Sequence, residues 1–187
     1  EAANYLNRIC EGKSYSPNNR RGLGIWEDGI VNLGDQLIID CKPVELFDQS
    51  YSKLIYSKTP RLLEWSEENI TQEQCKEILD ISQSFLWTDS KWGLFLAAWI
   101  AGAPICGALE WRPNIIITGP SGAGKSTIFN EFIAKLLDNS IEKFIGGSSA
   151  AGIVQALNPN GIPNALAVIY DEGDCDKEFN SAKMNAV

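Results

Sequence analysis

The chain has 187 residues, of which 44% are hydrophobic and 21% are charged. This composition is typical of one globular domain, or of a small domain joined to part of a larger one. The formal net charge of −8 argues against nucleic-acid binding through a uniformly basic surface, although a local basic groove is compatible with it. The sequence contains no histidine, which excludes most metal centres and the histidine-based catalytic triads.

The five cysteines lie far apart and form no Cys-x-x-Cys pair, so neither a disulfide framework nor a zinc ribbon is predicted. Residues 1–20 contain no apolar segment of the kind that secretory signal peptides carry. These features favour a reducing compartment, and we expect a cytoplasmic protein. The chain begins with Glu1 rather than Met, so we expect its natural start to lie upstream, where a targeting segment would not be seen.

Residues 22–56 predict a small antiparallel unit. Turns at Asp28-Gly29 and Gly34-Asp35 would separate strands at 22–27, 30–33 and 36–40, with further strands at 44–47 and 51–56. Such a unit is either a platform that binds nucleic acid or a partner, or an extension that packs on its neighbour, and the second interpretation is favoured. A basic face around it would consist of Arg20, Arg21, Lys53, Lys58 and Arg61.

Two helices are expected next. Thr71 and Gln74 form a capping box, and an apolar face interrupted by Ser82 follows as far as Trp87: Cys75, Ile78, Leu79, Phe85 and Leu86. Thr88 or Asp89 would cap a second helix that ends at the Gly102/Pro104 break. The uncharged segment 92–109 is at the lower limit of the length that spans a bilayer, but glycines and Pro104 divide it, so we expect burial in protein rather than in a membrane.

The segment 114–127 carries the motif that points to chemistry. Residues 114–118 predict a buried strand, residues 119–126 spell G-x-x-x-x-G-K-[ST], and after Thr127 a helical pattern follows through Ile128, Phe129, Phe132, Ile133 and Leu136. Glycines let backbone N–H groups curl around phosphate oxygens, and the start of a helix adds a positive dipole end. This P-loop predicts a nucleotide cradle made of Gly119, Pro120, Ser121, Gly122, Ala123, Gly124, Lys125, Ser126 and Thr127.

Individual roles follow from the chemistry of the side chains. Lys125 would reach the β- and γ-phosphates of ATP, and the Ser126 hydroxyl would bind Mg²⁺. A second buried strand at 165–170 ends in Asp171 and Glu172. We expect Asp171 to hold the metal and Glu172 to act with Lys125 in catalysis, as the base that orients the attacking water. The alternative is a strand that ends in a solvated acidic turn.

Between the two motifs, residues 141–145 predict a strand, and Ser148 or Ser149 would cap a short helix over 150–157. That helix either faces the channel of a ring or only connects strands. The predicted fold class is therefore α/β: a P-loop NTPase core with a parallel sheet and flanking helices, incomplete, preceded by a small antiparallel β unit and a helical segment. We expect three regions, at 1–62, 63–110 and 111–187.

The residues that lead into the P-loop, 103–113 (APICGALEWRP), resemble phage- and plasmid-type DNA primase-helicase proteins. Similar likenesses occur at 21–26 with 33–35, at 146–157 and at 169–172, so the resemblance covers most of residues 20–175. It implies an AAA+ or superfamily 3-like ATPase that forms a hexameric ring and moves along single-stranded DNA. The chain ends 15 residues after Glu172, without room for a sensor residue or an arginine finger, so we expect a fragment with little turnover of its own.

The sequence therefore predicts the ATP- and Mg²⁺-dependent motor of a replicative helicase from a phage or another mobile element. A competing interpretation is a P-loop kinase, which transfers the phosphoryl group to an acceptor, although Asp171-Glu172 argues against it. The motif is also compatible with a P-loop ATPase for protein remodelling or assembly, and with a module that binds nucleotide without hydrolysing it.

Overall fold

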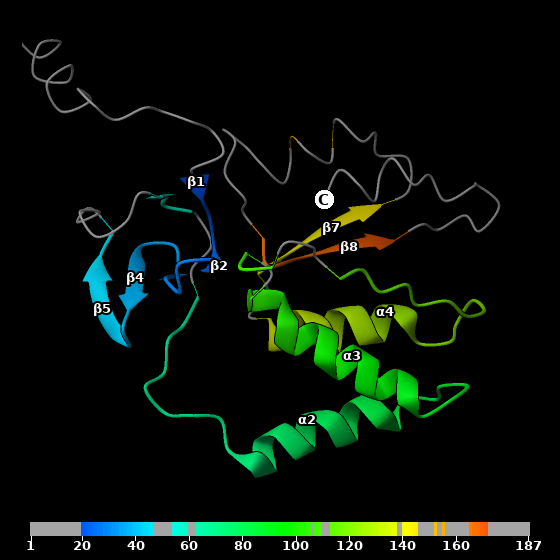
Figure 1. The fold of residues 1–187 in the computed structure, drawn as a ribbon. Helices are drawn as coiled ribbons and strands as arrows, with labels where there is room; N and C mark the ends of the chain where they lie inside the picture. Colours follow the sequence, from blue (N-terminus) through cyan, green and yellow to red (C-terminus); the bar gives the residue numbers. More distant parts are fainter. Residues whose placement is uncertain are drawn as a thin grey trace, which may run out of the picture.

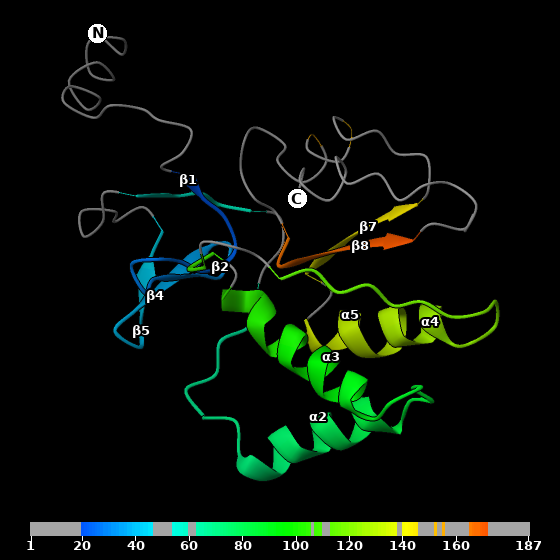
Figure 2. The ribbon, with the colours of Figure 1, turned by 45° about the vertical axis from the view of Figure 1, so that its right-hand side comes forward.

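The computed structural model describes residues 20–46, 54–59, 63–105, 107–109, 113–137, 140–145 and 165–171, together with the single positions 152 and 155. The described chain has a mixed α/β architecture, with parallel strand pairs, an antiparallel sheet and helices (Figure 1). The helices α2, α3 and α4 stack on one side of the parallel pair β7–β8, and a second view gives the same arrangement (Figure 2). The mixed α/β class that the sequence predicts is thus confirmed.

The N-terminal sheet is an antiparallel meander in the order β2-β3-β4-β5. Its bounds are Gly24–Ile25, Val31–Asn32, Gln36–Ile39 and Lys42–Glu45. Both predicted turns are present, because the Trp26 N–H donates to the Ile30 carbonyl at 3.1 Å, and Gly29 and Gly34 have φ angles of 79° and 113°. Such angles suit glycine, which has no Cβ to clash with the backbone.

The expectation that residues 51–56 extend this antiparallel unit is wrong for the part that the structure describes. Strand β6 (Ile55–Tyr56) pairs in parallel with β1 (Arg20–Arg21), which precedes the meander. Burial explains the pairing: Tyr56 is 2% exposed and packs in one cluster with Trp26, Ile30, Leu37 and Leu46. The aromatic ring is thus accommodated in the core of the β unit.

Helix α2 (Gln72–Ser84) begins with the predicted capping box. The Gln74 N–H donates to Thr71 Oγ1 at 3.2 Å, and the Thr71 N–H donates to Gln74 Oε1 at 2.8 Å. The helix ends at Ser84 and not near Trp87, because the chain turns extended at Phe85 and the Trp87 Nε1–H donates to the Ser82 carbonyl at 2.8 Å. The indole thus satisfies a carbonyl that one more helical turn would have used.

Helix α3 (Lys91–Gly102) continues as a short 3₁₀ turn, η2 (Ala103–Ile105), so the predicted break at Gly102/Pro104 is confirmed. The N-cap of α3 is Ser90, and not Thr88 or Asp89 as predicted, and the Ser90 side chain makes no capping hydrogen bond. Asp89 Oδ1 instead accepts a hydrogen bond from the Lys91 N–H at 3.0 Å. Among the described residues, no helix has both the length and the apolarity needed to cross a membrane.

The helix that follows the P-loop is continuous from α4 (Lys125–Thr127) through a π-helical segment, η3 (Ile128–Ile133), to α5 (Ala134–Leu136). The predicted apolar face is correct at Ile128, Phe132 and Ile133, which are buried, but Leu136 is 39% exposed and Leu137 is buried in its place. A π turn closes i→i+5 bonds and takes up more residues than an α turn. The core-facing positions are therefore shifted toward the C-terminus.

The parallel pair consists of β7 (Ile141–Ile145) and β8 (Ala167–Asp171), in a register from Ile141 opposite Ala167 to Ile145 opposite Asp171. Both strands were predicted. The expected helix at 150–157 lies outside the described residues except at positions 152 and 155. One core cluster joins this pair to α3 and the P-loop helix: Leu96, Ile100, Ala103, Ile128, Phe132, Ile133, Leu137 and Ala167.

The predicted strand at 114–118 is absent from the described structure, where this segment is extended chain without a β ladder. Its side chains nevertheless alternate. Ile115 and Ile117 pack against the core cluster, whereas Ile116 is 62% exposed. The prediction of a buried strand fails because only one side of this segment is covered by protein in the described part.

Candidate functional site

The loop at residues 119–124 has the backbone shape that its glycines permit. Gly122 and Gly124 have φ angles of 77° and 84°, in the left-handed region that other residues rarely adopt. A Cβ atom built on either glycine would meet nothing within 4 Å, so the space beside both is open. The conformation of the loop therefore favours glycine at both positions, and the open space beside them leaves room for a phosphate group to approach the backbone.

Lys125 folds back over this loop. Its ammonium Nζ donates to the carbonyl oxygens of Gly119 at 2.7 Å and of Pro120 at 2.9 Å. A lysine ammonium has three N–H donors, so these two contacts hold it above the loop and leave a third donor for an anion. The structure thus brings the predicted phosphate-binding lysine and the predicted cradle together in one unit.

The start of the helix adds further donors. Gly124 is its N-cap, in a left-handed conformation and without a side-chain cap, and the Ile128 N–H donates to the Gly124 carbonyl at 3.0 Å. The N–H groups of the residues before Ile128 have no carbonyl to bond within the helix. Ser126 and Thr127, which lie in this first turn, are at least partly accessible to solvent. An anion at this position would meet backbone donors and a lysine, next to two residues that carry hydroxyl groups.

The acidic pair is placed only in part. Asp171 is the last residue of β8, and its backbone lies opposite Ile145 at the end of β7. The arrowheads of both strands point toward the end of the core at which the P-loop meets α4 (Figure 2). Glu172 lies outside the described residues, so the roles assigned to Asp171 and Glu172 stay predictions.

A groove of about 1100 Å³ opens beside the P-loop, and sequence reasoning missed it. One wall is the face of α3 that carries Trp92, Phe95 and Trp99, and the other is the extended segment 113–120 with part of the P-loop helix. We expected the aromatic residues of α3 to be core. The sequence did carry a signal for this groove, because α3 is apolar on all sides. The core residues Leu96 and Ile100 need only one side of the helix, so the other apolar side chains are left to line a groove.

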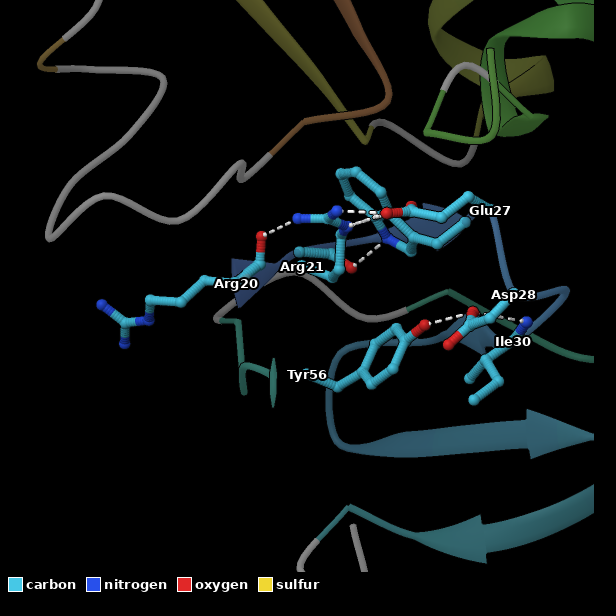
Figure 3. A network of polar contacts seen from close by, with 8 residues as sticks. Arg20, Arg21, Glu27, Asp28, Ile30 and Tyr56 are labelled. Atoms are coloured by element: carbon cyan, nitrogen blue, oxygen red, sulfur yellow. Dashed lines mark hydrogen bonds and ion pairs between the residues drawn. The ribbon is translucent and has the colours of Figure 1, made fainter. Parts of the chain in front are cut away.

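One residue of the predicted basic face, Arg21, makes its contacts within the β unit. Arg21 pairs with Glu27, with Nε 3.0 Å from Glu27 Oε2 (Figure 3). Its guanidinium carbon lies 5.0 Å from the ring centroid of Trp26. The hydrogen bond from Arg21 holds the pKa of the Glu27 carboxyl below its usual value. Arg21 therefore stabilises the unit, while Lys53 and Arg61 lie outside the described residues.

The chain resembles a DNA translocase. It is 28% identical over 150 residues to the DNA translocase FtsK of Caldanaerobacter subterraneus subsp. tengcongensis, an alignment that covers 80% of this chain and 21% of that protein. The chain thus spans about a fifth of the length of the curated relative that it matches. No family model and no solved structure matches the chain. The likeness supports a distant relationship to a P-loop DNA motor and gives no support to the primase-helicase family in particular.

Proposed function

We propose that this chain is the nucleotide-binding part of an ATP-driven DNA motor. The observation that carries the proposal is the geometry around Lys125, whose ammonium is held by two loop carbonyls above an open cradle at the start of a helix. The motif predicts this arrangement, and the likeness to a DNA translocase favours DNA as the track.

In this mechanism the backbone of residues 119–124 and the third donor of Lys125 bind the phosphates of ATP. Ser126 and Asp171 would hold Mg²⁺, which neutralises negative charge on the phosphates when it is bound. Glu172 would accept a proton from water and orient it toward the γ-phosphorus. The accessible position of Ser126 and the open space beside Gly122 and Gly124 fit this assignment.

Nucleotide binding is tested by removing the lysine side chain. We expect Lys125→Ala to weaken ATP binding roughly ten- to a hundredfold, because a charge-assisted hydrogen bond to a phosphate is lost. Isothermal titration calorimetry measures this change. The matched control is Lys135→Ala, which removes a lysine from the same helix whose ammonium pairs with Glu131 Oε2 at 2.5 Å, away from the loop. Equal weakening in both variants would show that charge alone, and not the cradle, attracts the nucleotide.

The motor itself is tested in the protein that contains this chain with any flanking parts. We expect its ATP turnover to rise when DNA is added, and Glu172→Gln to abolish turnover while ATP still binds. A rate of ATP turnover that does not change when DNA is added would contradict the motor proposal and favour a remodelling or assembly ATPase. Transfer of phosphate to an acceptor other than water would favour a kinase.

The finer proposal is a replicative primase-helicase that forms a hexameric ring on single-stranded DNA, as the likeness of residues 103–113 suggests. Comparing single-stranded with double-stranded DNA as the activator separates it from a translocase on duplex DNA. Activation by duplex alone would overturn the helicase proposal and leave the motor proposal intact.

A further inference from the structure

The groove beside the P-loop exposes aromatic rings to solvent. Trp92 is 43% exposed and Phe95 is 55% exposed, and their ring centroids lie 5.7 Å apart with the planes tilted by 35°. The groove that they line also includes Gly119, Pro120, Gly124, Lys125 and Thr127. A ligand whose phosphates occupy the P-loop therefore has an apolar, aromatic surface within the same groove.

The other two indoles of the groove are held by the fold. The Trp87 Nε1–H donates to the Ser82 carbonyl at 2.8 Å, and the Trp99 Nε1–H donates to the Pro113 carbonyl at 2.8 Å. The second bond ties α3 to the segment that leads directly into the P-loop. The wall that carries Trp92 and Phe95 is thus fixed relative to the loop, as a preformed ligand site requires.

We propose that the base of the bound nucleoside triphosphate stacks against Trp92 and Phe95 in this groove. The inference rests on the proposed nucleotide-binding function of the P-loop. Every nucleobase has a π face that aromatic side chains bind, and a groove of about 1100 Å³ is large enough for a nucleotide. The Lys91 ammonium lies 4.8 Å from the Trp92 ring centroid and 2.9 Å from Asp89 Oδ2, but such surface contacts are weak and an incoming base can displace them.

The test compares ATP with inorganic tripolyphosphate, which has the phosphates without the base. Calorimetry with Mg²⁺ present gives both affinities for the wild-type chain, Trp92→Ala and Phe95→Ala. We expect each variant to bind ATP roughly tenfold more weakly and tripolyphosphate unchanged, because only the stacking surface is lost. Trp92→Phe keeps an aromatic ring and is expected to retain most of the ATP affinity.

The matched control is Trp65→Ala, which removes a tryptophan that is 41% exposed and lines a different cavity. It is expected to leave both affinities unchanged. Tripolyphosphate binding as tightly as ATP to the wild type would overturn the stacking proposal while the P-loop function stands. Unchanged ATP affinity in Trp92→Ala and Phe95→Ala would also overturn the stacking proposal. A loss of self-association in these two variants would then identify the groove as an interface between copies of the chain. If the wild type binds neither ligand, the proposed function fails as well.

Discussion

Tyr56 and Asp28 form a short hydrogen bond between a hydroxyl and a carboxylate in the β unit. The Tyr56 hydroxyl donates to Asp28 Oδ1 at 2.5 Å, and the same oxygen accepts from the Ile30 N–H at 3.2 Å (Figure 3). Burial raises the pKa of Tyr56 far above its usual value, and the hydrogen bond to Asp28 raises it further. This bond joins β6 to the turn between β2 and β3, in addition to the pairing of β6 with β1.

The raised pKa makes stability depend on pH in a defined direction. Because the folded-state pKa lies above the unfolded value of about 10, the stabilisation is complete below that pH and is lost as the pH rises above it. We expect the free energy of unfolding of the wild-type protein to be about 1–2 kcal/mol higher than that of the Tyr56→Phe variant near pH 8. Urea unfolding near pH 11 should show a smaller difference. A difference that stays constant between the two pH values would contradict this account.

Residue types predict local chemistry well where the partner is adjacent in sequence. The capping box of Thr71 and Gln74 and the turns at Gly29 and Gly34 are examples, since each is satisfied within four residues. Ser82 shows the limit. It interrupts the predicted apolar face of α2, yet it is 0% exposed, and its hydroxyl donates to the Gly93 carbonyl at 2.7 Å on another helix. A pattern within one helix cannot reveal a partner on the next one.

The α2–α3 pair depends on a close approach at Gly93. A Cβ atom at this position would lie 2.7 Å from Gln83 Cα and 2.7 Å from the Ser82 carbonyl oxygen, and both are backbone atoms that cannot step aside. Ser82 and Gly93 therefore have to be small for the two helix backbones to come this near. The interruption of the apolar face is a packing requirement.

Substitution at Gly93 tests this approach. We expect Gly93→Ala to lower the free energy of unfolding by about 1–3 kcal/mol, because the methyl group overpacks the helix contact. The matched change is Gly102→Ala, at the other end of α3, where a Cβ would meet nothing within 4 Å. That variant should be neutral or slightly more stable, since alanine favours a helix over glycine. Chemical denaturation of both variants measures the contrast, and equal destabilisation would refute it.

The sequence predicts the positions of most helices and strands, but it does not predict which positions of a helix are buried or which strands pair. β8 is found because it lies in a short run of apolar residues, and α2 because its cap is local. The failures have tertiary causes. Residues 114–118 have the composition of a strand, but a strand also needs a hydrogen-bonded neighbour, and the π-helical segment shifts the buried position from Leu136 to Leu137.

The β unit and the core meet at glycines. A Cβ at Gly24 would lie 2.8 Å from the Pro104 carbonyl oxygen, and one at Gly107 would lie 2.6 Å from the Ile25 carbonyl oxygen. Gly107 also forms a β-bridge with Trp26. Pro104 belongs to the turn that ends α3, so the unit contacts the chain between the helical segment and the P-loop. No periodicity in the sequence predicts this contact.

Two glycines of the β unit allow the effect of the contact with Pro104 to be measured separately from the strain of a positive φ angle. Gly24 and Gly29 both have positive φ, of 101° and 79°, but only Gly24 faces a neighbour. We expect Gly29→Ala to lower the free energy of unfolding by about 1 kcal/mol from strain alone, and Gly24→Ala by about 1–3 kcal/mol more. Thermal unfolding with limited proteolysis should show that the β unit of Gly24→Ala opens before the core. Similar losses would mean that the contact contributes little.

The spacing of the paired strands sets an order of assembly. The meander β2-β3-β4-β5 and the α2–α3 pair join neighbours in sequence, whereas β7 and β8 must meet across the segment between Ile145 and Ala167. Closing a long loop before its contacts form is entropically costly and slows folding. We therefore expect the meander and the helix pair to form early during refolding. The strand pair that carries Asp171 to the P-loop end of the core would then complete the proposed nucleotide site last.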